Sequence, residues 1–359
     1  MISRDVFAAA GLLAVLAFAV TPGTAASPES AKETYRKASG TIGLHVENDI
    51  FAGTDRGYTN GFKLVWLSPE IGPGPGRLPL TGFLGNLARR LPFSATPEAR
   101  RYLSLSFGQN IFTPQDIWRR NLIIDDRPYA GFTYGTLGFY ARGPSVLDGF
   151  EATIGVVGPA SLGGDVQKFL HRTFGWTRPE GWPNQIKNEL ILGFGADRKW
   201  KVRKPDPSGV FDWDAIVRAH GRISNAVTGA GAGFEIRAGR NLPRDFGSSF
   251  ILPGGGGTGI GDENGFRTSG TPGAVHVFAV FEGQAVARDI FLDGNTFRES
   301  HRVVKRPLVA DIALGLAFRK DRIRASFAYV LRSRRFVGQT YREIFGAFNL
   351  SLDLGPAHR

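Results

Sequence analysis

Long runs in which apolar and polar residues alternate are the feature that most constrains this chain. In the C-terminal third, one such face carries Leu308, Ala310, Ile312, Leu314, Leu316 and Phe318. After a tight turn at 319–321, the alternation resumes from Ile323 to Leu331. A period of two predicts strands with one apolar face. A membrane-crossing strand needs roughly 9–11 residues, and soluble strands average about 5–6, so these runs are long enough to cross a membrane.

The same period recurs along the chain and predicts twelve strands. They cover 40–50, 58–68, 101–111, 128–141, 149–157, 187–203, 209–222, 229–240, 274–287, 304–319, 321–333 and 339–354. An even number of antiparallel strands can close into a barrel, and closure leaves no unpaired edge in the hydrocarbon. We therefore predict an all-β fold, a twelve-stranded antiparallel transmembrane β-barrel.

Composition agrees with a barrel that is exported. The chain has no cysteine, so a closed sheet or a core has to stabilise it without disulfides. Its 48 glycines and 28 phenylalanines suit tapered strands whose outer face meets lipid.

The N-terminus has the features of a secretory signal peptide. Arg4 precedes an apolar stretch at 6–20, and Thr24-Ala25-Ala26 offers a cleavage site before Ser27. This stretch is too short to span a bilayer of roughly 30 Å. We expect residues 1–26 to be removed and residues 27–359 to form a barrel in the outer membrane of a Gram-negative cell.

The net charge of +12 predicts an anionic partner. After export, nucleic acid is excluded as that partner. Outer-membrane lipid head groups or a phosphorylated glycolipid are the anions that such a barrel meets.

The segment 158–189 is the one long connection that is typical of a helix. Gln167 and His171 are four residues apart in it, so both side chains would lie on one helix face. We interpret the segment as a short helical loop that carries a catalytic histidine across the mouth of the barrel.

Strand parity predicts which connections share a rim. With Gly40 starting a strand that runs outward, three connections emerge at the outer rim: 50–58, 111–128 and 157–187. Three others emerge at the opposite rim: 68–101, 141–149 and 240–274. Two of the latter are long, although short turns are expected at that rim. The polar motifs cluster at the outer rim, which places the site there.

Two side chains from the first strands complete the predicted site. By alternation, Asp49 falls on the polar face with His45 and Glu47, and Thr59 falls opposite Phe62. Both are therefore expected to point into the barrel near its rim. An imidazole can remove a proton from water, while a carboxylate-bound hard cation or amide donors stabilise an oxyanion. A histidine, a carboxylate, an amide and a hydroxyl are together sufficient for a hydrolase.

Four motifs follow one another in the first half of the chain. They are Asn48-Asp49 with Asp55 to Gly61, then Gln109 to Pro114, Gly158 to His171 and Trp182 to Asn188. This order and spacing resembles the outer-membrane lipid A 3-O-deacylases across residues 40–190. Beyond residue 190 only the strand pattern supports the resemblance.

The resemblance implies calcium-dependent hydrolysis of the ester that holds the acyloxyacyl group at the 3′ position of lipid A in lipopolysaccharide. Carried over by motif, His171 resembles the general base and Gln167 its neighbour on the helix. Asn48, Asp49 and Thr59 resemble the calcium and oxyanion surroundings, with Asp49 as the metal ligand. We expect a Ca²⁺ cofactor, a monomer, and lipid A as the substrate.

The second loop departs from the family pattern. Members with established activity have a lysine there, and ungapped counting from Thr113 places Arg119 at that position. Arginine keeps the charge and binds phosphate bidentately, but it does not reproduce a compact ammonium. Arg119 and the adjacent Arg120 are both candidates for binding the lipid A phosphates.

Three alternatives stay open from the residues alone. An outer-membrane phospholipase would act on glycerophospholipid, although no serine sits beside His171 in a recognisable motif. A porin-like or structural barrel without activity is favoured by arginine at the lysine position. A soluble periplasmic β-sandwich is the third alternative.

Overall fold

The computed structural model describes residues 40–71, 99–203, 211–251 and 273–355. The predicted signal peptide, 1–26, lies outside the described residues. No helix among the described residues is long and apolar enough to span a membrane.

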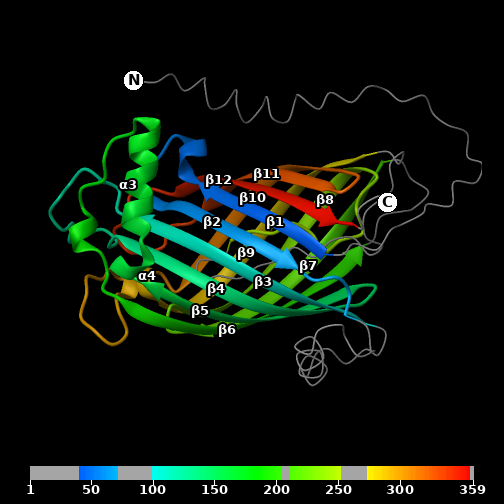
Figure 1. Ribbon diagram of the computed structural model, residues 1–359, viewed down its shortest axis with the longest axis horizontal. Helices are drawn as coiled ribbons and strands as arrows, with labels where there is room; N and C mark the ends of the chain where they lie inside the picture. The colour runs from blue at the N-terminus through cyan, green and yellow to red at the C-terminus, as the bar shows by residue number, and fades with distance from the viewer. Residues whose placement is uncertain (1–39, 72–98, 204–210, 252–272, 356–359) are drawn as a thin grey trace, which may run out of the picture.

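Twelve antiparallel strands close into a barrel in the described chain, with β1 paired to β12 (Figure 1). They are β1 (Gly40–Asn48), β2 (Gly57–Leu67), β3 (Arg100–Thr113), β4 (Ala130–Arg142), β5 (Val146–Val157), β6 (Glu189–Arg203), β7 (Phe211–Ser224), β8 (Val227–Arg240), β9 (Ala274–Asp289), β10 (Leu308–Lys320), β11 (Ile323–Arg332) and β12 (Glu343–Leu354). The predicted barrel is confirmed. Its largest boundary errors are four residues, at the starts of β10 and β12.

Helical turns gather at one rim of the barrel (Figure 1). They are η1 (Asp49–Ala52), η2 (Pro159–Ser161), α3 (Gly163–Phe174), η3 (Trp182–Asn184) and α4 (Ile290–Asp293). The predicted helical loop is α3, and we call this end the outer rim. Residue 40 at the start of β1 pairs with residue 354 at the opposite rim.

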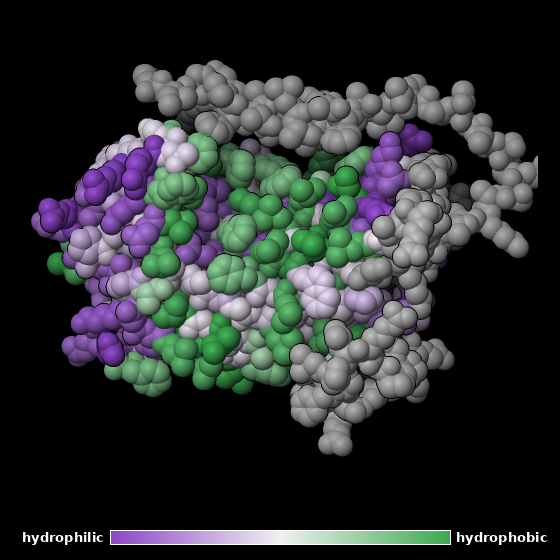
Figure 2. All heavy atoms as spheres, viewed as in Figure 1, coloured by the Kyte–Doolittle hydropathy of each residue, from purple (hydrophilic) through white to green (hydrophobic). Residues whose placement is uncertain are grey.

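The outward faces of the strands are apolar, as the alternation predicted. Leu105 and Phe107 on β3 are exposed, and so is Leu314 on β10. On the face that Figure 2 shows, hydrophobic residues cover the middle of the barrel and hydrophilic residues gather at the outer rim. An apolar surface of this kind fits contact with lipid.

The lumen is filled with charged side chains and by a segment that folds into it. Arg237 Nε donates to Asp214 Oδ1 at 2.8 Å, with both side chains buried. The segment at 241–251 leaves β8 and enters the barrel, where Ile251 N donates to Glu47 Oε1 at 2.7 Å. Lys199 Nζ donates to the Phe246 carbonyl at 3.3 Å. Pairing satisfies charges that burial would otherwise destabilise.

Candidate active site

The helix α3 packs against the outside of the barrel wall, on β3 and β4 (Figure 1). Gly131 on β4 and Gly163 at the helix start allow this approach, because a Cβ on Gly131 would lie 2.9 Å from Gly163 Cα. Gln109 Nε2 on β3 donates to the Ser161 carbonyl at 2.7 Å. The helix ends at Gly175, whose φ of 69° is a conformation that glycine adopts without strain.

A cavity of about 1200 Å³ lies between α3, η1 and the outer wall of the barrel. Five of the predicted site residues line it: Asn48, Asp49, Thr59, Gln167 and His171. Tyr329 and Ile344 form part of the same lining. Their side chains belong to the outward faces of β11 and β12 and are 49% and 42% exposed. The cavity is therefore continuous with the surface that faces lipid.

Thr59 points outward, so the prediction that it faces the lumen was wrong. The pairing of β2 with β3 shifts register between Tyr58 and Asn60. This bulge turns Tyr58 into the lumen, where Arg332 stacks over its ring at 4.6 Å. Thr59 consequently joins the outward face, and its hydroxyl lies 2.7 Å from that of Thr113. A bulge adds one residue to a strand and reverses the faces beyond it.

Asp49 also lies outside the lumen, contrary to the prediction. The strand β1 ends at Asn48, whose Oδ1 accepts the Ile50 N–H at 2.8 Å and starts the turn η1. The turn folds over the outer face of β12, since a Cβ on Gly346 would lie 2.6 Å from Phe51. Asp49 is buried beneath the turn, and its Oδ2 accepts the Arg56 N–H at 2.6 Å.

His171 is held between two oxygens. Its Nδ1 bonds to the Thr177 carbonyl, and its Nε2 lies 3.2 Å from Asp55 Oδ2. Gln167, one turn earlier on α3, donates from Nε2 to Asp55 Oδ1 at 3.3 Å. Trp182 Nε1 in turn donates to Gln167 Oε1 at 2.8 Å. This chain of contacts fixes the two helix residues that the sequence placed on one face.

The pKa values of His171 and Asp49, on the two sides of the cavity, are both raised, but by different causes. Burial alone lowers the pKa of His171, but the hydrogen bonds to Asp55 and to the Thr177 carbonyl outweigh it and raise that pKa. Burial and the neighbouring charge of Asp55 raise the pKa of Asp49 well above its usual range, against the Arg56 N–H and the Thr54 hydroxyl. Asp55 therefore acts on both groups.

Arg119 and Arg120 lie beside the cavity rather than in its lining. Both side chains are exposed on the loop between β3 and β4, which also supplies Trp118 to the cavity. The backbone carbonyl of Arg120 accepts a hydrogen bond from Asn184 Nδ2 at 2.6 Å. The arginine that does line the cavity is Arg56, which stacks over the Tyr341 ring at 4.7 Å.

Asp55 is the site residue that the sequence did not single out. It stands inside the quoted motif from Asp55 to Gly61, but its side chain reaches His171 only through the fold. Two acids within one connection, Asp49 and Asp55, are the signal that could have identified it. Their repulsion is visible in the raised pKa of Asp49.

The donor set at this wall of the cavity fits a hard cation. Asp49 uses Oδ2 for its two side-chain hydrogen bonds, and Oδ1 accepts none from the described residues. Calcium accepts carboxylates, backbone carbonyls and water, and it would relieve the repulsion between Asp49 and Asp55. No group of three His, Cys, Asp or Glu side chains with metal-site geometry occurs in the described part of the chain, so a cation held by Asp49 would need backbone carbonyls or water as its other ligands.

Fold and site together define an outer-membrane β-barrel whose lipid-facing wall has a cavity lined in part by polar side chains, among them Asp55, Gln167 and His171. The family model described as outer membrane protein LpxR matches residues 10–354. The chain therefore belongs to the LpxR family of outer membrane proteins.

One solved structure has the same fold by comparison, and two further barrels match more weakly. The chain is similar to LpxR from Salmonella typhimurium, with a TM-score of 0.66 and 17% identity over 87% of this chain and 99% of that chain. The β domain of the Bordetella autotransporter BrkA gives a TM-score of 0.41, with 10% identity over 88% and 98% of the two chains. The KdgM porin gives 0.35, with 7% identity over 87% and 98%. A comparison with curated protein sequences gives no match.

Proposed function

We propose that this protein is a lipid A deacylase that hydrolyses the ester of the 3′-linked acyloxyacyl chain. The supporting observation is the position of the cavity. It joins a polar wall carrying His171 to exposed, outward-facing Tyr329 and Ile344. A lipid in the outer leaflet can therefore place an ester beside His171 while its acyl chains stay against the hydrophobic outer wall.

His171 is the proposed general base. Its Nδ1 is engaged by the Thr177 carbonyl, so Nε2 is the nitrogen available to take a proton from water. Asp55 Oδ2 occupies that position in the structure, at 3.2 Å. The Asp55 side chain is one-third exposed, which leaves it free to rotate away when an ester and a water enter.

Thr59 is the proposed donor to the oxyanion. Its hydroxyl and that of Thr113 form one hydrogen bond, which uses one of their two protons. When Thr113 donates, the Thr59 proton is free to donate into the cavity that Thr59 lines. Gln167 keeps α3 aligned through Trp182 and Asp55.

Calcium is the proposed cofactor, held by Asp49 together with oxygens of η1 or water. When bound, such a cation polarises an ester carbonyl and stabilises its oxyanion. Asn48 supports this site indirectly, because its amide oxygen caps the turn that carries Asp49. Arg119 and Arg120, exposed beside the cavity, are the proposed contacts for the lipid A phosphates.

The lining of the cavity favours attack by water over a serine nucleophile. Its hydroxyl groups belong to Thr54, Thr59, Thr177 and Tyr329, and no serine occurs among its described residues. This disfavours a phospholipase with a serine nucleophile. The filled lumen, with 241–251 folded into it, disfavours a porin-like function for the described barrel.

Mass spectrometry of lipid A, with and without expression of the protein, tests the proposal. We expect release of the 3′-linked acyloxyacyl chain by the wild type. His171→Ala should insert as a folded barrel and leave lipid A fully acylated. Phospholipid vesicles treated in parallel should lose no acyl chain. Unchanged lipid A with the wild type, or equal deacylation by His171→Ala, contradicts the proposal.

A further inference from the structure

A second cavity, of about 60 Å³, lies inside the barrel beneath the loops of the outer rim. Neighbouring residues show that it is separate from the candidate active site. Ile111 lines the outer cavity, whereas Phe112, the next residue of β3, lines the inner one. Ile344 and Glu343 on β12 divide in the same way. Successive strand residues face opposite sides of a sheet, so the barrel wall separates the two cavities.

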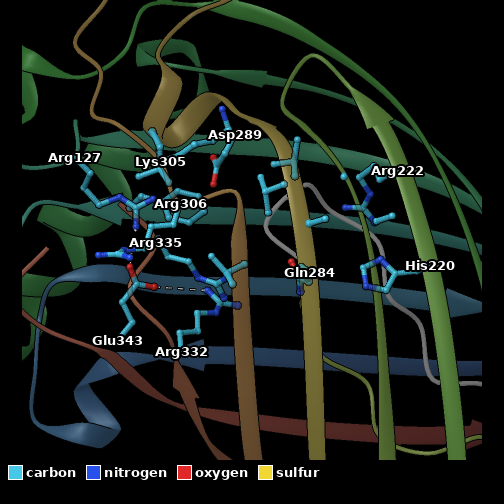
Figure 3. Close-up of a pocket in the computed structure, with 18 residues that line it drawn as sticks. Arg127, His220, Arg222, Gln284, Asp289, Lys305, Arg306, Arg332, Arg335 and Glu343 are labelled. Atoms are coloured by element: carbon cyan, nitrogen blue, oxygen red, sulfur yellow. Dashed lines mark hydrogen bonds and ion pairs between the residues drawn. The ribbon is translucent and has the colours of Figure 1, made fainter. Parts of the chain in front are cut away.

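The lining of this lumenal pocket is strongly basic. Its cationic residues are Arg127, Arg222, Lys305, Arg306, Arg332 and Arg335. Its acidic residues are Asp289 and Glu343. Figure 3 shows Arg332, Arg335 and Glu343 on one side of the pocket, Arg222 and His220 on the other, and Gln284 between them.

Some of these cations already have carboxylate partners. Arg127 NH1 donates to Glu343 Oε1 at 3.0 Å. Lys305 Nζ lies 3.0 Å from Asp293 Oδ1, and Arg335 is paired with Asp311. Their charge is therefore largely balanced within the protein.

Arg332 and Arg222 differ, because neither guanidinium makes a hydrogen bond to any described residue. The carboxylates nearest to Arg332 are Asp311, 3.5 Å from Nε, and Glu343, 4.0 Å from NH1. The carboxylate nearest to Arg222 is Glu151, at 3.8 Å. Arg332 is only 6% exposed, and its Nε is buried without an acceptor. A buried donor without an acceptor destabilises the folded state, so an acceptor from solvent or a ligand is expected to satisfy Arg332 Nε.

Neighbouring polar groups do not supply the missing acceptors. Glu282 is the closest acid to His220 and Gln284, and it accepts from both, at 3.0 Å and 2.9 Å. It is also paired with Arg218. Glu282 is therefore already occupied by His220, Gln284 and Arg218 and is not an acceptor for Arg332 or Arg222.

We propose that the lumenal pocket binds a phosphate-class oxyanion between Arg332 and Arg222. A guanidinium offers a planar fork of N–H donors that matches two oxygens of a phosphate. The pocket has room for about four to six water molecules, which is also enough for one phosphate group.

Access comes from the outer rim. Arg306 is exposed and Lys305 is half-buried on the connection after α4, and both line the pocket. The same site chemistry accepts free inorganic phosphate or a phosphate group on the saccharide of an outer-leaflet glycolipid.

Isothermal titration with inorganic phosphate tests the proposal on the full-length barrel, purified in detergent without phosphate or sulfate. We expect saturable binding by the wild type. Arg222→Gln and Arg332→Gln should each weaken it by about tenfold or more, since each removes one charged donor pair. Arg222→Lys keeps the charge but lacks the planar pair of N–H donors, so its phosphate affinity should lie between those of the wild type and Arg222→Gln.

The matched control is Arg324→Gln. Arg324 is paired with Asp353 near the opposite rim and does not line the lumenal pocket, so phosphate binding should not change. Far-ultraviolet circular dichroism and heat-modifiable gel migration establish that each variant is folded. No binding by the wild type overturns the proposal, and so does binding as tight as that of the wild type by the folded Arg222→Gln and Arg332→Gln variants.

A competition experiment identifies the source of the phosphate. Lipopolysaccharide with phosphorylated core sugars displaces inorganic phosphate when the saccharide is the ligand. Its dephosphorylated form should then fail to compete. When neither form competes, the site takes the free anion. Arg222→Gln should retain ester hydrolysis, because the wall of the barrel separates the two cavities.

Discussion

Asp55 Oδ2 lies 3.2 Å from His171 Nε2, across the gap between the first connection of the barrel and the helix α3. This contact joins the proposed general base to the segment that carries Asp49. Burial lowers the pKa of His171, but the hydrogen bond and charge of Asp55, together with the Thr177 carbonyl, outweigh burial and raise that pKa.

The pH dependence of hydrolysis follows from this contact. A general base acts in its neutral form, so a raised pKa of His171 moves the acidic limb of the kcat/KM profile to higher pH. Asp55→Asn removes the carboxylate charge and weakens the hydrogen bond that raise the pKa of His171, so it should move that limb to lower pH. The profile measured on purified lipid A checks this. An unmoved acidic limb would show that Asp55 does not control the base.

The bulge in β2 makes Thr59 a testable oxyanion donor. Thr59→Val keeps the β-branched shape but removes the hydroxyl, and kcat should fall by about 10²–10³ with little change in KM. Thr113→Val is the matched control, since Thr113 bonds to Thr59 but does not line the cavity. Its effect should be clearly smaller. Equal losses in the two variants would assign the pair a structural role only.

Hydrolysis should depend on calcium, and calcium binding should depend on Asp49. Removal of the cation with a chelator should abolish hydrolysis by the wild type, and added calcium should restore it. Asp49→Ala should be inactive with or without calcium, and calorimetry should show weakened calcium binding. Asp165→Ala removes an exposed acid from α3 and should behave like the wild type. Full activity in chelator would exclude the cation from catalysis.

Replacing Gly131, at the contact between α3 and the barrel, should lower activity without changing the fold of the barrel. Gly131→Ala places a Cβ 2.2 Å from Ser161 Oγ and 2.9 Å from Gly163 Cα, so α3 has to shift. A misplacement approaching 1 Å costs on the order of 10²-fold in rate. Gly135→Ala, on the same face of β4, meets only Ser106 O at 3.7 Å and should be nearly silent. Rates are compared with circular dichroism, which should be unchanged in both variants.

The exposed arginines of the second loop should act on substrate binding. Each charge near an anionic lipid surface contributes about 1 kcal/mol, so the double variant R119Q/R120Q should raise KM by about tenfold or more and keep kcat. The control is R298Q/R302Q, a second exposed pair on the connection after α4. An equal rise in KM for the control pair would show that net surface charge, and not the position of Arg119 and Arg120, causes the effect.

The sequence by itself determined the strands, their pairing order and the rim that carries the site. These follow from local alternation, which each strand shows along its own length. The motifs also identified five residues that line one cavity, Asn48, Asp49, Thr59, Gln167 and His171. Hydrophobic periodicity is strong in long strands, because every second side chain has to meet lipid.

Only the tertiary structure decided which side of the wall the site occupies. The bulge between Tyr58 and Asn60 depends on pairing with β3, and it turns Thr59 outward. The turn η1 takes Asp49 out of the strand alternation, and close contact at Gly131 brings α3 onto the outer face. The contact of Asp55 with His171 arises from segments far apart in the chain. So does the lumenal pocket that Arg222 and Arg332 line. Local sequence patterns do not predict such contacts, because the contacting segments meet only when the barrel closes.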